Sequence, residues 1–279
     1  LMPRIYFLYA KQDSETTLPK FDSGSYTPSF SSIFRRDHFS GYDELRGTRR
    51  ISIGITTAFF NRNSGKEFFK TSIGQIKYLD NRDSFLPSGT SETLPSKSSP
   101  LFVQSRLQFK QIGVSGSYEW DPEKSETNQL NLSMRYRGKN PSKIFNLSYS
   151  YTKDRTNESR RFQNSKETNL SFFWPIENKW SLIGRWNFDL DNNQTIESLF
   201  GLEYNECCWR TRIVTRRYKI QDRSNFGIVE KPIIQSSTSG HRTNTGFFLE
   251  FQLKGLSTLG ERLDVLLENS ISGYQSRTN

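Results

Sequence analysis

Long apolar runs are missing from this sequence. No stretch approaches the ~20 consecutive apolar residues that a membrane-spanning helix needs, so a helical membrane protein is excluded. Only 33% of the 279 residues are hydrophobic, and the mean hydropathy is −0.73. Low hydropathy alone is typical of soluble or partly disordered chains, so other features must decide the class of protein.

Residue types that carry catalysis or bind metals are also scarce, with 2 histidines and 2 cysteines in the chain. His38 and His241 both lie in segments that we predict to be long loops. Ser239 is close to His241 in sequence, but closeness within one loop does not indicate the Ser-His arrangement of a hydrolase. We therefore predict no catalytic residue, no metal site and no cofactor, and a protein that is not an enzyme.

Aromatic residues, in contrast, are abundant and argue against disorder. They make up 14% of the chain, with 22 Phe and 12 Tyr. Many belong to segments in which apolar and polar residues alternate; the clearest aliphatic example is Ile51, Ile53 and Ile55, which alternate with Ser52 and Gly54. A period of two is typical of strands that bury one face.

The alternation recurs along the whole chain. It predicts about twelve strands, most of them about ten residues long, which matches the ~9–11 residues of a tilted transmembrane strand. Besides a short first strand at 4–9, the strand-like segments are 51–59, 68–79, 101–109, 112–120, 130–137, 145–151, 169–174, 180–190, 196–204, 209–216 and 246–254.

A soluble β-sandwich that acts as a binding module is the alternative explanation of this alternation, but its strands are usually shorter, ~5–6 residues. Charged residues such as Arg135 and Arg185 lie on the polar faces, and aromatic residues such as Trp120 and Trp180 lie toward strand ends. Aromatic residues at strand ends are typical of the interfacial girdles of membrane barrels. We therefore predict an all-β fold, a transmembrane antiparallel β-barrel segment.

One segment departs from the alternation. In 68–79, Ile73 lies on one face of the expected strand, whereas Ile76 and Tyr78 lie on the other. An extra residue in a strand shifts the side chains to opposite faces. We therefore predict a β-bulge near Gly74.

The long connections fall at alternate positions along the chain. Alternate connections of an antiparallel sheet share one end, and membrane barrels have short periplasmic turns and long external loops. We therefore predict that 11–48, 80–100 and 219–244 are extracellular. Residues 1–254 would form the strands and their loops, and 255–279 a periplasmic tail. Because the sequence starts directly in strand-like residues, we expect a fragment or a processed chain.

The net charge of +10 indicates either a solvated basic surface or an anionic partner, and charge alone does not separate lipid phosphate from nucleic acid. Basic residues on the polar faces can pair with acidic residues of the same barrel, or they can attract phosphorylated sugars. The candidates that we expect to face the lumen are Arg106, Arg135, Arg137, Arg185 and Arg212.

The 2 cysteines are adjacent, at Cys207 and Cys208. Successive side chains of a strand point to opposite faces, so a bond between these two residues is disfavoured. Two free thiols are unusual in an oxidising periplasm. Two interpretations remain: a pair of small buried residues, or disulfides to cysteines outside this chain, which we favour.

Several motifs resemble the LptD family of lipopolysaccharide-assembly proteins. The most specific are Gly201-Leu-Glu-Tyr-Asn-Glu-Cys-Cys-Trp209 and Gly246-Phe-Phe-Leu-Glu-Phe-Gln-Leu-Lys-Gly-Leu256, followed by Ile271-Ser-Gly-Tyr274. The resemblance runs nearly end to end and implies the C-terminal part of a larger outer-membrane barrel of a Gram-negative-type bacterium. It implies insertion of lipopolysaccharide into the outer leaflet. The implied partners are the lipoprotein LptE in the lumen and periplasmic Lpt bridge proteins, which act through an N-terminal domain, and no nucleic acid.

The resemblance also implies roles for individual residues. Cys207 and Cys208 would form disulfides with cysteines of the N-terminal region. The last long strand would border a lateral opening of the barrel, through the candidates Phe247, Leu249, Phe251 and Leu253. A general porin or a ligand-gated receptor barrel for small solutes is the alternative function. The two outermost strands, at 4–9 and 246–254, are each expected to lack one neighbour.

Overall fold

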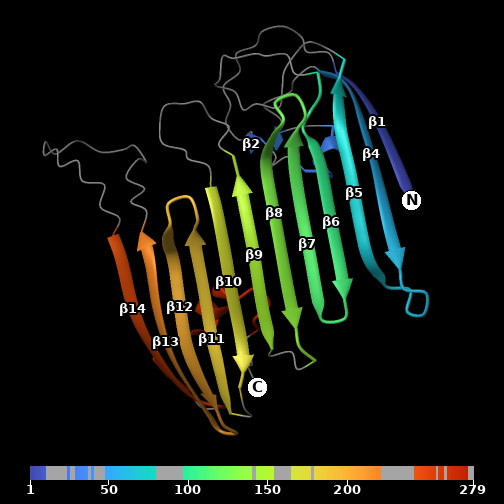
Figure 1. Cartoon of the computed structure of the whole chain (residues 1–279). Coiled ribbons are helices and arrows are strands. Elements are labelled where there is room, and N and C mark those ends of the chain that lie inside the picture. The colour runs from blue at the N-terminus through green and yellow to red at the C-terminus, as the bar shows by residue number, and fades with distance from the viewer. Residues whose placement is uncertain are drawn as a thin grey trace, which may run out of the picture. The chain divides into compact units, whose positions relative to one another are not determined.

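The computed structural model describes residues 1–10, 24–25, 29–36, 39–40, 48–79, 97–139, 143–153, 165–176, 179–220, 242–255, 257–260 and 263–275. Thirteen of its strands form one sheet in the order β1-β4-β5-β6-β7-β8-β9-β10-β11-β12-β13-β14-β15, and Figure 1 labels this series from β1 to β14. Twelve of them are long, and neighbouring strands with a recorded register pair antiparallel. The predicted fold class, an all-β segment of an antiparallel barrel with about twelve long strands, is confirmed.

The bounds of the strands are close to those predicted from the alternation. The strands of the sheet are β1 (Met2–Ala10), β4 (Thr48–Phe60), β5 (Glu67–Tyr78), β6 (Leu101–Phe109), β7 (Ile112–Asp121), β8 (Glu126–Arg137), β9 (Ile144–Thr152), β10 (Ser165–Pro175), β11 (Trp180–Asp189), β12 (Gln194–Asn205), β13 (Trp209–Ile220), β14 (Arg242–Leu253) and β15 (Ser257–Gly260). Two short strands, β2 (Gly24–Ser25) and β3 (Phe39–Ser40), pair separately.

Helical structure is limited to two short elements in the described parts of the chain, the 3-10 helix η1 (Ser32–Phe34) and the helix α1 (Leu263–Ser270). Neither is long and apolar enough to cross a membrane. The chain divides into two compact units, the first made of residues 1–134 and 148–166 and the second of 135–147 and 167–279. Each unit covers its polar sheet face with one of these helices.

The distribution of side chains is inverted relative to a soluble protein. Large apolar residues in mid-strand are exposed, including Ile53 at 51%, Phe200 at 52% and Leu249 at 54%, whereas Arg50 and Arg212 are fully buried at 0%. Soluble proteins almost never bury arginine completely and rarely expose rows of large apolar residues. The faces that the alternation assigned are therefore those of the structure.

In the first unit, η1 packs on the polar face of β4, β5 and β6. Phe30, Ile33, Ile76 and Phe102 form a buried apolar cluster there. The predicted bulge near Gly74 is wrong, because the β4–β5 register continues through Gly74 and shifts only between Phe59 and Phe60. Ile76 points to the polar face because η1 turns that part of the face into a core.

Gly54 and Gly74, which are paired across β4 and β5, make room for η1. A Cβ on Gly74 would lie 2.7 Å from Ile33 Cδ1 and 3.0 Å from the Ile53 carbonyl oxygen. The strand backbone cannot move away without breaking the ladder, so η1 must shift. The absence of a side chain is therefore required for this contact.

We expect Gly74→Ala to lower the stability of the full-length protein by about 1–3 kcal/mol, the usual effect of overpacking a filled core. Gly116→Ala in β7 is the matched control, since its Cβ would meet the end of the Leu132 side chain at 3.1 Å and the Asn131 carbonyl oxygen at 3.6 Å, an ordinary contact distance. Thermal unfolding of the two variants and the wild type measures the difference. Equal midpoints for both variants would contradict the close approach of η1.

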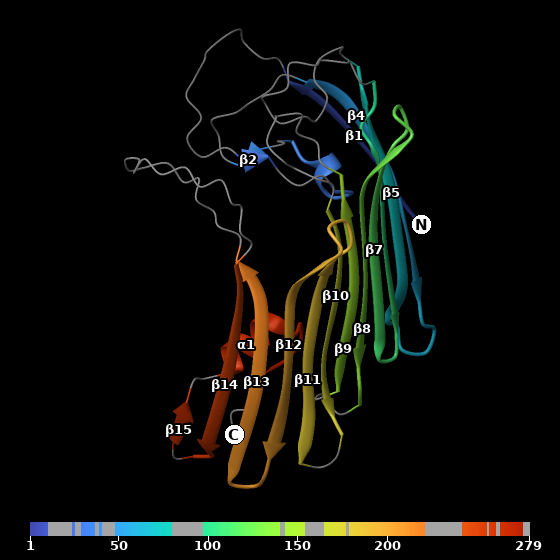
Figure 2. The same ribbon diagram turned by 60° about the vertical axis from the view of Figure 1, so that its left-hand side comes forward.

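In the second unit, α1 covers the polar face of the last strands. Figure 2 shows α1 behind β13 and β14, with β15 beside β14. Leu263, Leu267 and Ile271 are spaced by four residues and are almost completely buried, so they form one apolar stripe of the helix. This stripe packs against apolar residues from five strands, namely Ile144, Phe173, Ile183, Leu199 and Val214.

The two ends of the strand order differ. β1 lies at one end and pairs with β4. The expectation that the last long strand also lacks a second neighbour is wrong for its final part, because β15 pairs with β14 from Glu250 to Leu253. The chain turns back after β14, with Gly255 at φ +82°, a backbone conformation that favours glycine. β15 therefore pairs with the final part of the β14 edge, which was expected to have no neighbour.

Candidate site on the polar face

Arg212 is the centre of a buried ionic cluster on the polar face of the second unit. The strand register places it directly opposite Glu203 of β12 and Glu250 of β14. Its Nε donates to Glu203 Oε2 at 2.7 Å, and its Nη1 donates to Glu250 Oε2 at 3.0 Å. Three neighbouring strands are therefore joined by one guanidinium.

The tail supplies the remaining partners of Arg212. Nη1 also donates to Asp264 Oδ1 at 2.7 Å, and Nη2 donates to the Tyr274 hydroxyl at 2.8 Å. Burial raises the pKa of Tyr274 to about 12, so its hydroxyl is neutral at pH 7 and accepts the hydrogen bond without adding charge. Arg210 lies on the same face of β13 as Arg212, and its Nη2 is 3.4 Å from Asp264 Oδ2. The cluster binds the start of α1 and Tyr274, which follows the helix, to the sheet.

Arg185 binds the other end of α1. Its Nη1 donates to the carbonyl oxygens of Asn269 and Ser270, at 3.2 and 3.1 Å. The last carbonyls of a helix lack partners within the helix and carry the negative end of its dipole, so a cation there is favourable. Arg185 also pairs with Glu197 at 3.3 Å, and Glu197 pairs with Arg216 at 2.6 Å.

Arg135 and Arg137 contact the segment after α1. Arg135 Nη2 donates to Ser272 Oγ at 3.0 Å. Gly273 has φ +89°, and a Cβ on it would lie 2.6 Å from Arg137 Nη2. Glycine is needed here for both the backbone conformation and the close approach. Four of the five basic candidates therefore contact residues 264–274.

Arg106 is the exception among the predicted basic residues. It is exposed on the polar face of β6, opposite Lys70 of β5 and Ser115 of β7. The structure thus divides the five candidates. Those of the second unit hold the tail and its acidic groups, while Arg106, in the first unit, has no ionic partner among the described side chains.

The cysteines lie in the tight turn between β12 and β13. Cys207 and Cys208 are both exposed and free, and their Sγ atoms are 2.8 Å apart. The expectation that their side chains point to opposite faces is wrong, because that rule holds within a strand and these residues belong to the turn. The hydrogen bond with Cys207 raises the pKa of Cys208.

Contacts around Glu206 hold this turn. Lys179 Nζ lies 2.6 Å from its carboxylate, the Tyr204 hydroxyl donates to the same oxygen at 2.8 Å, and Lys254 Nζ donates to its carbonyl oxygen at 2.6 Å. The hydrogen bond from Lys179 lowers the pKa of Glu206. The thiols are therefore presented to solvent on a fixed turn.

Aromatic side chains form a ladder next to the same turn. The ring centroids of Trp180 and Tyr204 are 4.8 Å apart, those of Tyr204 and Trp209 are 4.9 Å apart, and those of Trp209 and Phe251 are 5.9 Å apart. Tyr and Trp pair an apolar ring with a polar group, which suits a boundary between lipid and water. Lys254 and Lys179 lie at the same end.

The candidates for the lateral opening share one face of β14. Phe247 is 72% and Leu249 is 54% exposed, whereas Phe251 and Leu253 are partly covered. Phe251 belongs to the aromatic ladder, and Leu253 pairs with Ser257 of β15. His38, His241 and Ser239 lie outside the described residues.

The sequence analysis missed the acidic residues and the tyrosine of the cluster, Glu203, Glu250, Asp264 and Tyr274. A signal was present: Leu263, Leu267 and Ile271 have helical spacing. The Glu-Arg-Glu row was not visible, because the register of three separate strands must be known to find it.

Comparisons with known proteins agree with this architecture. A family model described as LptD, LPS transport system D, matches residues 1–180. The LPS-assembly protein LptD of Saccharophagus degradans is 31% identical over 297 residues, which cover 99% of this chain and 32% of that protein. The proteins of the same name from Pseudomonas aeruginosa (strain LESB58) and Pseudomonas savastanoi pv. phaseolicola are each 29% identical, with the same coverage. The chain spans about a third of these relatives, 32% of their length. The match to the family model over most of the chain shows that it belongs to the LptD family.

Proposed function

We propose that this chain is the C-terminal part of an outer-membrane β-barrel that inserts lipopolysaccharide into the outer leaflet of a Gram-negative-type bacterium, without catalysing a reaction. Membership in the LptD family supports this proposal, since the relatives named above are LPS-assembly proteins. The observation that carries it is the combination of a family match with the inverted distribution of side chains. Rows of exposed aliphatic residues need a lipid environment, and buried arginines need a polar interior.

The same distribution supports a placement of the chain in the membrane. The face with Ile53, Phe200 and Leu249 would contact lipid, and the face with Arg106 and Arg212 would line the lumen. The connections 11–48, 80–100 and 219–244 follow alternate strands and would be extracellular, because membrane barrels have long external loops and short periplasmic turns. Residues 1–254 would then form the barrel portion, and 255–279 would enter from the periplasmic side, where the β12–β13 turn and its cysteines lie.

Under this proposal, the partners would bind the full-length protein at different parts of it. Lipopolysaccharide would be the transported lipid, LptE would occupy the lumen, and the periplasmic Lpt bridge proteins would contact an N-terminal domain. Arg106 and Lys70 form a basic pair on the polar face, which is suited to the phosphates of a sugar-containing headgroup. No nucleic acid and no cofactor is part of the proposal.

Depletion of the full-length protein tests the function. Cells that lose it should accumulate newly made lipopolysaccharide inside the outer membrane, and expression of the intact gene should restore surface labelling of lipopolysaccharide. A porin or receptor, the alternative, would instead change the uptake of small solutes while lipopolysaccharide still reached the surface. Normal surface lipopolysaccharide after complete depletion would contradict the proposal.

We expect Phe200→Arg to destabilise the full-length protein in membranes by about 2–4 kcal/mol. The arginine would stand at a lipid-facing position near the middle of the membrane, where its charge is poorly solvated. Leu190→Arg is the control. Leu190 is 45% exposed, close to Phe200 in exposure, but lies just after β11, where the same change should cost about 0–1 kcal/mol. Urea unfolding in lipid vesicles compares the two. An equal effect at both positions would show that Phe200 does not face the membrane interior.

A further inference from the structure

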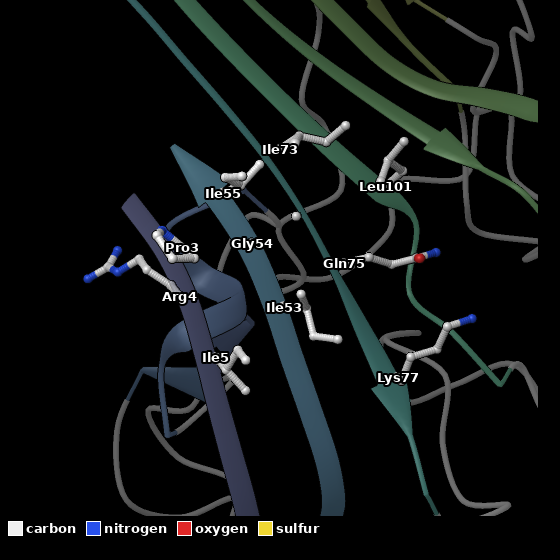
Figure 3. A pocket seen from close by; sticks show the side chains of 11 residues that line it. Pro3, Arg4, Ile5, Ile53, Gly54, Ile55, Ile73, Gln75, Lys77 and Leu101 are labelled. Atoms are coloured by element: carbon white, nitrogen blue, oxygen red, sulfur yellow. The ribbon is translucent and has the colours of Figure 1, made fainter. Parts of the chain in front are cut away.

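The exposed apolar face offers lipids two kinds of surface. In the first unit it contains a hollow of about 410 Å³, which Figure 3 shows between aliphatic side chains of β1, β4 and β5. Its walls include Ile5, Ile53, Ile55 and Ile73, and such walls contact acyl chains without distinguishing one lipid headgroup from another. In the second unit, the face carries aromatic rings and a lysine beside the turn between β8 and β9. These groups can distinguish headgroups by charge.

Tyr136 and Trp174 form an aromatic pair on the apolar face of the second unit. Each is the penultimate residue of its strand, β8 and β10, so both lie at the end that carries the short turns. Their rings are stacked, with centroids 6.1 Å apart and 28° between the planes. Trp174 is 37% exposed. The pair therefore presents partly exposed rings where a membrane strand meets the boundary between lipid and water, the place that suits Tyr and Trp.

Lys143 places a positive charge against this aromatic pair. Its Nζ lies 5.3 Å from the centre of the Trp174 ring, a cation–π contact that keeps the ammonium beside the ring without neutralising it. The Gly138 N–H donates to the Lys143 carbonyl oxygen at 2.8 Å, which closes the turn from β8 to β9. Lys139 of the same turn is exposed. In the described part of the chain no carboxylate pairs with Lys139 or Lys143, so the turn carries two uncompensated positive charges.

The next turn at this end, between β10 and β11, has similar residues but a neutralised charge. Trp180 starts β11, and its ring centroid lies 4.8 Å from that of Tyr204. Lys179, however, lies 2.6 Å from the Glu206 carboxylate, and this carboxylate would repel an anionic headgroup. Of these two turns, only the one with Lys143 combines exposed aromatic rings with uncompensated positive charge. It is therefore the turn that suits an acidic lipid.

We propose that this surface binds one acidic phospholipid, with its phosphate at Lys143 and Lys139 and its glycerol and upper acyl carbons against Tyr136 and Trp174. Lysines at the membrane surface attract lipids with net negative charge, whereas the cation of a zwitterionic headgroup cancels most of this attraction. The proposal rests on the proposed function, because it needs this face to lie in the bilayer. It goes beyond that function, since the bound lipid is a resident phospholipid of the leaflet at the short turns and not the transported lipopolysaccharide.

Lipid binding by the full-length protein in detergent, followed by native mass spectrometry, tests the site. The probes are phosphatidylglycerol and phosphatidylcholine with the same acyl chains. We expect Lys143→Gln to weaken the binding of the first phosphatidylglycerol about two- to fivefold, the effect of one lysine at an acidic headgroup, and to leave phosphatidylcholine binding unchanged. Lys66→Gln is the control, because Lys66 is an exposed lysine of another short turn, that between β4 and β5, and should change neither.

A second pair of variants tests the aromatic surface. Trp174→Leu removes the ring beside Lys143 and should weaken the binding of both lipids. Trp180→Leu changes a tryptophan of similar exposure, 44% against 37% for Trp174, next to the turn that Glu206 neutralises, and should have no effect. Equal results for Lys143→Gln and Lys66→Gln, or for Trp174→Leu and Trp180→Leu, would overturn the site.

Surface lipopolysaccharide, measured in parallel, separates this proposal from the proposed function. If the full-length protein binds phosphatidylglycerol as expected but does not support lipopolysaccharide assembly, the function is refuted and the site is retained. If lipopolysaccharide reaches the surface normally while Lys143→Gln and Trp174→Leu bind both lipids as the wild type does, the site is refuted and the function is retained.

Discussion

Replacing Arg212 with methionine is expected to destabilise the full-length protein by about 3–5 kcal/mol, the usual cost of removing one partner from a buried ionic cluster. Arg212 is fully buried and donates to Glu203, Glu250 and Asp264. Without it, three carboxylates would remain in a space closed to water. Either the carboxylates would take up protons or water would enter this space. Both changes would weaken the contacts that hold α1 on the sheet.

The effect can be measured as the urea midpoint of the protein in lipid vesicles, with protease sensitivity of the tail as a second readout. Arg106→Met is the control, because Arg106 is an exposed arginine on the polar face of the first unit and surface changes usually stay within ~0.5 kcal/mol. If uncompensated charge is the cause, adding Glu203→Gln and Asp264→Asn to Arg212→Met should recover part of the loss. A mild Arg212→Met, no worse than Arg106→Met, would contradict this account.

The strands could be predicted from sequence because each has one face that contacts a uniform environment. A period of two depends on a single strand, so Ile51, Ile53 and Ile55 reveal their face without knowledge of any neighbour. The same alternation in 130–137, 196–204 and 246–254 assigns Leu132, Phe200 and Leu249 to the apolar faces, and all three side chains are exposed in the structure. Connection lengths then followed from the strand bounds.

The exceptions to alternation were the part that sequence could not explain. Ile76 in the first unit, and Phe173, Leu199 and Val214 in the second, are apolar residues on otherwise polar faces. Each lies where a segment from outside the strands, η1 or α1, covers that face. These apolar residues are explained by contacts between distant parts of the chain. The local pattern therefore showed that the alternation was interrupted but could not show why. At Ile76 the anomaly was interpreted as a bulge for that reason.

The cysteines show a similar limit. Adjacent residues diverge only in a strand, and whether Cys207 and Cys208 belonged to a strand or to a turn depended on where β12 ended. The structure ends β12 at Asn205 and starts β13 at Trp209. The geometric argument against a bond between the two cysteines is therefore removed, and a direct bond becomes the competing outcome of any experiment on their pairing.

Changing both Cys207 and Cys208 to serine is expected to abolish the oxidised form of the full-length protein and with it most of the assembly of lipopolysaccharide. Both thiols are exposed on a turn that Lys179 and Lys254 hold through Glu206. The chain has 2 cysteines in total, so partners other than each other must come from outside it. We propose that they come from the N-terminal region, and that the bonds fix the periplasmic domain against this end of the barrel.

Each single change should be milder than the double change, because the remaining cysteine can still form one bond to the N-terminal region. Non-reducing electrophoresis of the full-length wild type, both single variants and the double variant measures this, with reduced samples as the control for mobility. A bond between Cys207 and Cys208 found by mass spectrometry, or unchanged oxidised mobility in the double variant, would contradict the external partners.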